Sequence, residues 1–362
     1  MPLKARNGVH KEQIKAGTVG RLKGHSFEKK LSEWLNSLQI SKELFEKSKS
    51  HIVVGHPAKE LVRYICQHEQ IGKISSVKAC WLGGLATVRK IALVKNRKIE
   101  ADWKEPVKKE KSKSDVLAEI TYGDEHFIQR GISVKVCNNK TPTNDQLFCT
   151  GAASFCDLLI SNGIQVSSKA REALKMFCGD KGFRPIDLLS NTQIKNRKSN
   201  PERFFWEELP EKGREELEKI FTQNQNQITS ILLKKGSYTG DPYPPQYLIH
   251  QRTLYYDINK VPLAIFHIDE LVEFSAMYSR FWKKKYRIKK GRFKNDPNIH
   301  EAPRFGFIQF QRLGNIQNAT ELQFNLKAGY FNKISELEKK LKTEGSKRYN
   351  LPSLLKWQSM QL

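Results

Sequence analysis

The amino-acid sequence predicts an α/β protein with a central mixed β-sheet flanked by helices, followed by a C-terminal β-rich region. Three patterns predict this class. Amphipathic stretches with capping signals recur through residues 1–240, two strand-like segments meet at Gly123-Asp124, and strand patterns return at 304–312 and 320–327. We therefore divide the chain into a core with N-terminal helices (1–240) and a C-terminal region that ends in a helix (241–362).

Helices are expected on both sides of the central strands. Ser26 can cap the first of them, and Pro57 can open a second over 57–70, since proline suits a first helical position. A helix is expected from Asn144 to about 162, and another over 167–178 that stops at Gly179. A helix interrupted by Pro210 and a terminal helix through Leu337 complete the set.

A hairpin is predicted over residues 115–137. Residues 115–122 and 126–137 both favour strand, and Ile132 and Val134 alternate with Ser133 and Lys135. If the strands pair around the turn, Asp115 lies across from the segment 133–135. The hairpin therefore brings a carboxylate and an ammonium group to the same end of a sheet.

The charge of the chain points to a polyanionic partner. Sixty-three Lys and Arg against 38 Asp and Glu leave a net charge of +25 over 362 residues. Such a field attracts nucleic acid and speeds its association, so nucleic acid is the expected partner. An anionic membrane is the rival partner, but the sequence holds no apolar run of ~20 residues and no hydrophobic segment after Met1.

Other function classes lack their motifs. The sequence contains no GxxxxGK[ST] pattern for ATP, no HExxH and no GxSxG. Its six cysteines form no CxxC pair and are expected to be reduced, which is typical of a cytoplasmic protein.

Asp115 and Lys135 suit metal-dependent cleavage of a phosphodiester. A carboxylate and a backbone carbonyl, such as that of Val134, can hold Mg²⁺ while several waters remain bound. Lys135 can orient a water or stabilise charge on the phosphate. The alternative is an ordinary exposed hairpin with one Asp and one Lys facing solvent.

The motif also resembles a known family. Ser114-Asp115, then seventeen residues, then Ser133-Val134-Lys135 is similar to the signature of the MspI-type restriction endonucleases, a group of PD-(D/E)XK nucleases. Further fragments resemble that group in the same order along the chain: Gly20-Arg21-Leu22 through Phe27-Glu28-Lys29, Cys149-Thr150-Gly151, Arg304-Phe305-Gly306-Phe307 and Leu322-Gln323-Phe324.

The resemblance implies roles for single residues. It makes Asp115 the metal ligand and Lys135 the catalytic lysine, with Mg²⁺ as cofactor. Ser133 stands where the family has an acid, Asn or Gln, and a hydroxyl supplies no second negative charge. A carboxylate from elsewhere is therefore expected, with Glu28 on the first helix preferred to Glu119. The alternative for Glu28 is a solvated charge on a helix face.

The C-terminal region is expected to contact DNA. Lys283, Lys284, Lys285 and Arg287 form a basic run with interleaved aromatic residues that can neutralise phosphates. The resemblance places base recognition on the strands beyond it. Polar side chains there can read base edges, although a hairpin facing water explains the alternation equally well. The candidates are Gln309, Gln311, Arg312, Gln317, Asn318, Gln323, Asn325 and Lys327.

The resemblance implies a type II restriction endonuclease that hydrolyses DNA with Mg²⁺ at a short palindrome rich in G and C. It needs no ATP, is a monomer or homodimer, and has a cognate DNA methyltransferase in the same host. Two alternatives stay open. One is a repair or structure-selective nuclease with the same core, and the other is a DNA-binding protein without catalysis, in which Ser133 marks a decayed site.

Overall fold

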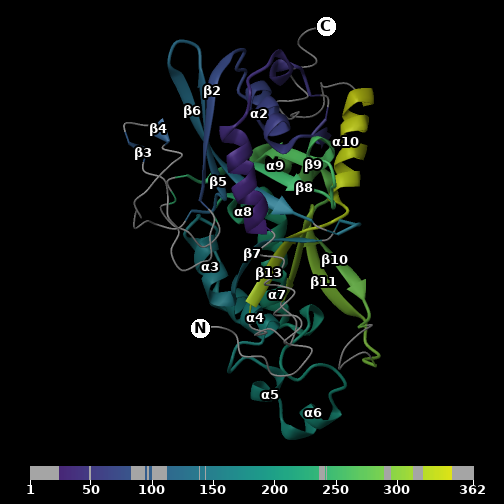
Figure 1. Cartoon of the computed structure of the whole chain (residues 1–362). Coiled ribbons are helices and arrows are strands. Elements are labelled where there is room, and N and C mark those ends of the chain that lie inside the picture. Colours follow the sequence, from purple (N-terminus) through teal and green to yellow (C-terminus); the bar gives the residue numbers. More distant parts are fainter. Residues whose placement is uncertain are drawn as a thin grey trace.

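The structure is a computed structural model of the 362-residue chain. It describes residues 24–48, 50–82, 94–95, 98–99, 112–137, 139–142, 144–235, 241, 243–288, 295–312 and 321–344. Figure 1 shows the path of the chain.

A six-stranded mixed sheet forms the centre of the molecule, in the order β1-β9-β8-β6-β5-β2. Its strands are β1 (Ile52–Gly55), β2 (Ile74–Trp81), β5 (Val116–Tyr122), β6 (His126–Val136), β8 (Pro245–Gln251) and β9 (Val261–His267). Strands β6 and β8 are parallel, and the other neighbours are antiparallel. The predicted fold class, a mixed sheet flanked by helices, is confirmed.

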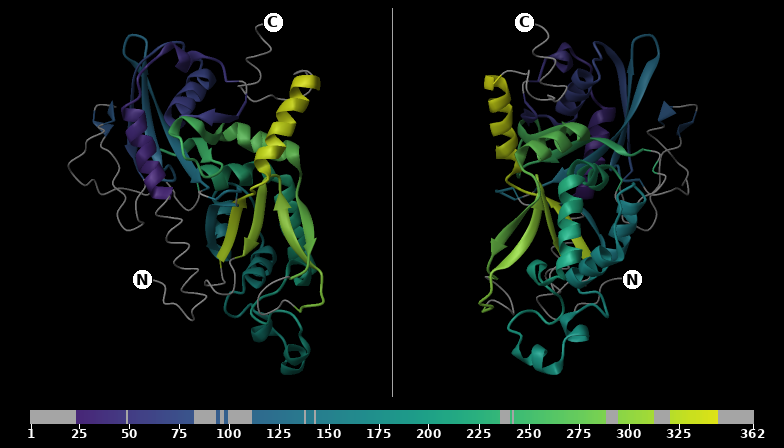
Figure 2. Two further views of the ribbon diagram at one scale, coloured as in Figure 1. Left: turned by 45° about the vertical axis from the view of Figure 1, so that its right-hand side comes forward. Right: turned by 180° about the vertical axis from the view of Figure 1, so that it is seen from behind.

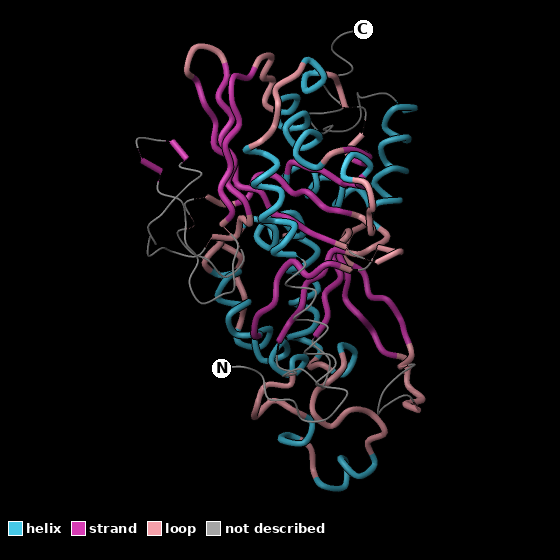
Figure 3. The backbone as a smooth tube through the Cα atoms, in the orientation of Figure 1, coloured by secondary structure: helices cyan, strands magenta, loops and turns pink. Residues whose placement is uncertain are grey.

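A second, five-stranded antiparallel sheet follows the order β10-β11-β12-β13-β7. It contains β7 (Asp145–Gly151), β10 (Trp282–Tyr286), β11 (His300–Phe305), β12 (Ile308–Arg312) and β13 (Glu321–Leu326). A short pair, β3 (Val94–Lys95) and β4 (Lys98–Ile99), forms a sheet of its own beside β2 and β5. In Figure 3 the six-stranded sheet occupies the upper part and the five-stranded sheet the lower part.

Helices cover both sheets. The first spans residues 24–36. The others are α2 (Pro57–His68), α3 (Ala152–Ile160), α4 (Ser168–Cys178), α5 (Pro185–Leu188), α6 (Asn191–Asn196), α7 (Glu211–Gln223), α8 (Gln225–Lys234), α9 (Ile268–Tyr278) and α10 (Tyr330–Glu344). Three short 3₁₀ turns are η1 (Lys42–Phe45), η2 (Trp206–Glu208) and η3 (Ile258–Lys260). No helix among the described residues is long and apolar enough to cross a membrane.

The six-stranded sheet separates two hydrophobic cores. On one face, Ile132 and Ile249 pack with the helix 24–36 and α2. On the other face, Leu248 and Phe266 join a larger core shared with the five-stranded sheet and with helices α3, α4, α7, α8 and α9. Figure 2 shows α10 standing against α9 at the side of the molecule. Period-two alternation of side chains explains how one strand serves both cores.

Two predicted elements differ from the structure. Residues 145–151, expected to be helical, form strand β7, because Phe148 pairs with Phe324 of β13 in the larger core. The helix begins only at Ala152. The segment 304–312, expected as one strand, forms β11 and β12 around Gly306. Gly306 has φ +52°, and a Cβ there would lie 2.0 Å from Ser275 Oγ, so only glycine fits this turn.

The expected division at residue 240 falls between α8 and β8. Both sheets take strands from both sides of it, since β8 and β9 lie in the six-stranded sheet and β7 lies in the five-stranded sheet. The two parts of the chain therefore share their sheets and cores. All six cysteines are free, as expected.

Candidate active site

The hairpin β5–β6 carries the first candidate residues. Its register places Val116 opposite Ile132 and Tyr122 opposite His126, so the turn occupies 123–125. Asp115 directly precedes β5, and its backbone N–H donates to the carbonyl of Ile132 at 2.8 Å. Figure 1 shows the two strands side by side along their length. The predicted pairing of the two segments is therefore found.

The Asp115 carboxylate is held by the facing strand. Its Oδ2 accepts a hydrogen bond from the backbone N–H of Val134 at 2.7 Å and one from Ser133 Oγ at 3.5 Å. In an extended strand the N–H and C=O of one residue face the same neighbour. The Val134 carbonyl, the expected metal ligand, thus faces the edge on which Asp115 lies.

The segment before Asp115 is fixed from another part of the chain. The N–H of Lys113 donates to Asp241 Oδ2 at 2.7 Å, and Ser114 Oγ donates to the carbonyl of Tyr243 at 2.6 Å. Gly131 on β6 permits this approach. A Cβ at that position would lie 2.2 Å from Ser114 Oγ, too close for any other residue without displacement.

Glu28 reaches the same place from the helix 24–36. Only 7% of it is exposed, and its Oε2 accepts hydrogen bonds from Trp81 Nε1 and His25 Nδ1, each at 3.1 Å. Burial raises the pKa of the Glu28 carboxyl, and the nearby charge of Asp115 raises that pKa further. Two carboxylates from distant segments therefore lie close enough to repel each other.

Lys135 follows on β6. It is half-buried and pairs in register with His250 of β8. Ser133 and Lys135 are two residues apart and therefore lie on the same face of the strand. Lys135 is ~7 Å along the strand from Ser133, whose hydroxyl contacts Asp115. Within the described part of the chain, its ammonium group forms no ion pair. It is thus available to a bound anion.

Glu119, the alternative second acid, is engaged elsewhere. It is buried on β5 opposite Lys78, and Gln129 Nε2 donates to it at 2.9 Å. Four residues of strand, ~13 Å, separate it from Asp115. The geometry therefore favours Glu28 over Glu119.

The donor set of Asp115 and Glu28 fits a hard divalent cation. Both groups are carboxylates, and magnesium is commonly held by one or two carboxylates with its remaining positions filled by water. The oxygens Asp115 Oδ1 and Glu28 Oε1 accept no hydrogen bond from the described residues. A larger set is absent: the described residues contain no group of three or more His, Cys, Asp or Glu side chains arranged for a metal.

The basic run predicted to meet phosphates lies on and just after β10. Lys284, Lys285 and Arg287 are exposed. Lys283 is instead paired with Glu218 at 3.0 Å and Glu301 at 3.5 Å, so its charge is already balanced.

The predicted base-reading residues separate into three groups. Gln309, Gln311, Gln323 and Lys327 are half-buried on or beside β12 and β13. Asn325, expected on the same polar face, is only 3% exposed, at a register shift between β13 and β7. Gln317 and Asn318 lie outside the described residues, as does the side chain of Arg312.

Some residues around the site had no sequence signal. Trp81 and His25 hold Glu28, and Asp241 and Tyr243 hold the segment before Asp115. His25 lies one helical turn before Glu28, whereas the contacts of Trp81, Asp241 and Tyr243 join residues far apart in the chain, and common residue types make them. Gly131, at the point where β6 passes Ser114, was the one position whose residue type hinted at a close approach.

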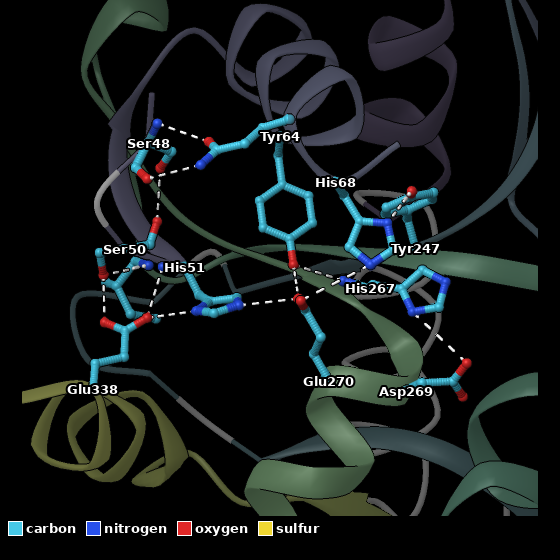
Figure 4. Close-up of polar contacts among 12 residues, drawn as sticks. Ser48, Ser50, His51, Tyr64, His68, Tyr247, His267, Asp269, Glu270 and Glu338 are labelled. Carbon is cyan, nitrogen blue, oxygen red and sulfur yellow. Dashed lines mark hydrogen bonds and ion pairs between the residues drawn. The ribbon is translucent and has the colours of Figure 1, made fainter. Parts of the chain in front are cut away.

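A second polar cluster, drawn in Figure 4, is centred on the buried groups His51, Tyr64 and Glu270. His51, with no exposed surface, contacts Glu338 of α10 at 2.5 Å through Nδ1 and Glu270 of α9 at 3.1 Å through Nε2. Tyr64 also donates to Glu270. His68 and His267 stack beside this group with ring centroids 4.3 Å apart. Because its central groups are buried and mutually paired, this cluster links β1, α9 and α10 and is not a substrate site.

Comparisons with known proteins give a likeness to solved structures but none to a known sequence or family. No family model matches the sequence, and no curated protein matches it either. Among solved structures, the chain is similar to a crystal structure of the restriction endonuclease MspI in complex with its cognate DNA. The sequence identity is 14% and the TM-score 0.45, over 86% of this chain and 92% of the other.

Proposed function

We propose that this chain is a magnesium-dependent endonuclease of double-stranded DNA, of the type II restriction kind. The observation that carries the proposal is the position of two carboxylates at the end of the β5–β6 hairpin. Asp115 directly precedes β5, and Glu28 accepts a hydrogen bond from Trp81, which pairs with Val116, the first residue of β5; Lys135 lies on β6 of the same hairpin. Paired carboxylates followed by a lysine on one sheet edge are what metal-assisted phosphodiester hydrolysis needs.

Asp115 and Glu28 are the residues that would hold Mg²⁺, together with the Val134 carbonyl. When bound, the ion would polarise the phosphate and make an attacking water more acidic. The N–H of Val134 orients Asp115, and Trp81 and His25 orient Glu28. A cation between the two carboxylates would also relieve the repulsion from Asp115, which adds to burial in raising the pKa of Glu28.

Lys135 acts on the substrate. Its ammonium group can bind a non-bridging oxygen of the scissile phosphate and stabilise the negative charge that builds there. Water then forms the new bond to phosphorus, and the bond from phosphorus to the 3′ oxygen breaks. The products carry 5′-phosphate and 3′-hydroxyl ends.

The charge distribution supports DNA as substrate. The chain carries a net charge of +25, and Lys284, Lys285 and Arg287 are exposed on and just after β10, the edge strand of the five-stranded sheet. A duplex carries one negative charge per ~1.7 Å of its axis, so such a surface gains affinity by releasing counterions. A type II enzyme of this kind would cut at a short palindrome and act beside a cognate methyltransferase in its host.

The test is cleavage of a sequenced, unmethylated plasmid with Mg²⁺ and with EDTA. Discrete fragments that require Mg²⁺ support the proposal, and sequencing their ends identifies the site. A smear would instead indicate a non-specific or repair nuclease. A gel shift without cutting would indicate a binding protein with a decayed site.

A matched pair of variants ties any cleavage to this site. Asp115→Ala removes the proposed ligand, whereas Asp124→Ala changes an exposed Asp at the turn of the same hairpin. Cleavage should disappear in the first and persist in the second. Equal activity of both would show that the cutting arises elsewhere.

A further inference from the structure

A row of carboxamides crosses the five-stranded sheet. Gln309 and Gln311 lie on β12, Gln323 on β13 and Gln146 on β7, and Asn144 directly precedes β7. We call these five residues the amide row. The opposite face of the sheet carries Phe310 and Phe324, which are fully buried in the larger core, so the amide row lies on the outer face.

The five side chains form one continuous chain of hydrogen bonds. Asn144 donates to Gln309 at 3.2 Å, Gln309 to Gln311 at 2.6 Å, Gln311 to Gln323 at 2.8 Å, and Gln323 to Gln146 at 2.8 Å. A bond from Ala328 N–H to Asn144 Oδ1 at 2.9 Å anchors the first member. The row therefore spans three neighbouring strands and is held at one end by backbone.

Stability does not account for such an arrangement. Bonds between two side chains are a minority of protein hydrogen bonds, and fixing each long glutamine costs up to ~2 kcal/mol of conformational entropy. At a half-exposed surface, water would satisfy the same groups. Fixing these side chains beforehand does reduce the entropy lost when a ligand binds.

The carboxamide donors and acceptors that are not used within the amide row indicate which ligand it can bind. A carboxamide has two N–H donors and an oxygen with two lone pairs. Gln309, Gln311 and Gln323 each spend one N–H and one lone pair within the row. Among the contacts of the described residues, each keeps one donor and one acceptor, the pair that binds the N7 and N6 positions of adenine in the major groove.

Cations border the row. The ammonium of Lys327 lies 5.7 Å from the ring centre of Tyr278, and Arg304 lies 5.5 Å from that of Trp282. Burial lowers the pKa of Lys327, and the charges of Arg304, Lys284 and Lys333 lower it further. Mutual repulsion of this kind is relieved when an anion such as a backbone phosphate binds.

We propose that the amide row reads adenine in the major groove of the DNA substrate, with Gln309, Gln311 and Gln323 on the β12–β13 ribbon as the reading residues. Gln146 and Asn144 set their orientation from β7. The inference rests on duplex DNA as the partner in the proposed function, and it requires A·T pairs in the recognised site. That differs from the G·C-rich site that the family resemblance implies.

The proposal is tested by selection rather than by cleavage. The full chain with Asp115→Ala is used to select from a pool of random-sequence duplexes, alone and combined with Gln311→Ala or Gln323→Ala. Gln223→Ala, an exposed glutamine on α7, is the matched control. The parent and the control should enrich one motif with fixed A·T pairs. Each row variant should lose a different one of them, with roughly tenfold or greater loss of affinity for the motif.

A base analogue sharpens the result. Replacing the required adenine by 7-deazaadenine removes the N7 acceptor, and it should weaken binding of the parent but not of the matching glutamine variant. A motif of G·C pairs alone, or an identical motif from both row variants, would overturn the inference. The selection does not depend on cleavage, so the two proposals can fail separately. If the Asp115→Ala chain selects A·T pairs but the unaltered chain does not cut plasmid DNA, only the proposed function is refuted.

Discussion

Raising the pH should loosen the buried link between β1, α9 and α10. His51 lies between Glu270 and Glu338 with no exposed surface. Although burial lowers its pKa, hydrogen bonds and charge from both carboxylates raise the pKa of His51 to about 9. Because the folded pKa exceeds the unfolded value, the contribution is complete below pH 6.5 and is lost as the pH rises through about 9.

The size of the effect follows from the same values. Each pH unit between the unfolded and folded pKa of His51 corresponds to ~1.4 kcal/mol, so the link contributes ~3 kcal/mol at pH 6. Replacing His51 by Gln should cost about this much at pH 6, since two buried carboxylates lose their counter-charge. By pH 10 the histidine of the unaltered chain is neutral, and the difference between the two proteins should nearly vanish.

The assay is urea unfolding of the unaltered chain and of His51→Gln, followed by tryptophan fluorescence at several pH values from 6 to 10. His126→Gln, at the exposed end of the hairpin, is the control and should show no pH-dependent difference. A difference for His51→Gln that stays constant across this range would refute a charged histidine in the link.

Four other changes test the candidate site. Asp115→Ala should lower the cleavage rate by more than ~10³-fold while a gel shift persists; undiminished cutting would remove this residue from the site. Lys135→Ala should lower the single-turnover rate ~10²-fold or more without weakening Mg²⁺ affinity, and a loss confined to metal binding would contradict its role on the phosphate. Glu28→Gln should raise the thermal midpoint without metal, because it removes repulsion, and reduce the stabilisation that Mg²⁺ gives. Gly131→Ala should cost ~1–3 kcal/mol of unfolding free energy, since its Cβ would meet Ser114.

Local signals predicted many elements correctly. The helix expected over 167–178 is α4, because Ser167 accepts a hydrogen bond from the N–H of Ala170 and Gly179 takes the left-handed conformation. The strand β7 was missed because Leu147 and Phe148 also suit a helical stripe, and only pairing with β13 makes them a strand. Partners that arise from distant segments leave no local pattern.

The same limit applies to the site. The spacing between Asp115 and Lys135 predicted that they lie at the same end of a sheet, because a single hairpin joins them. Glu28 was a candidate only through the family resemblance, and its approach to Asp115 depends on how one helix packs on β2. Asn325 followed the alternation expected for an exposed face, but a register shift buries it.

Strand β6 obtains its second neighbour late in synthesis. On the side away from β5, β6 pairs with β8, so that Val134 and Val136 of β6 lie beside Ile249 and Gln251 of β8. Contacts from Asp241 and Tyr243 also fix the segment before Asp115. A growing chain that has not yet passed this point lacks the partners that order both segments of the candidate site. A ribosome-bound or truncated N-terminal part therefore holds Glu28, Asp115 and Lys135 without the scaffold that aligns them, so the proposed activity would begin only when the remainder of the chain has folded.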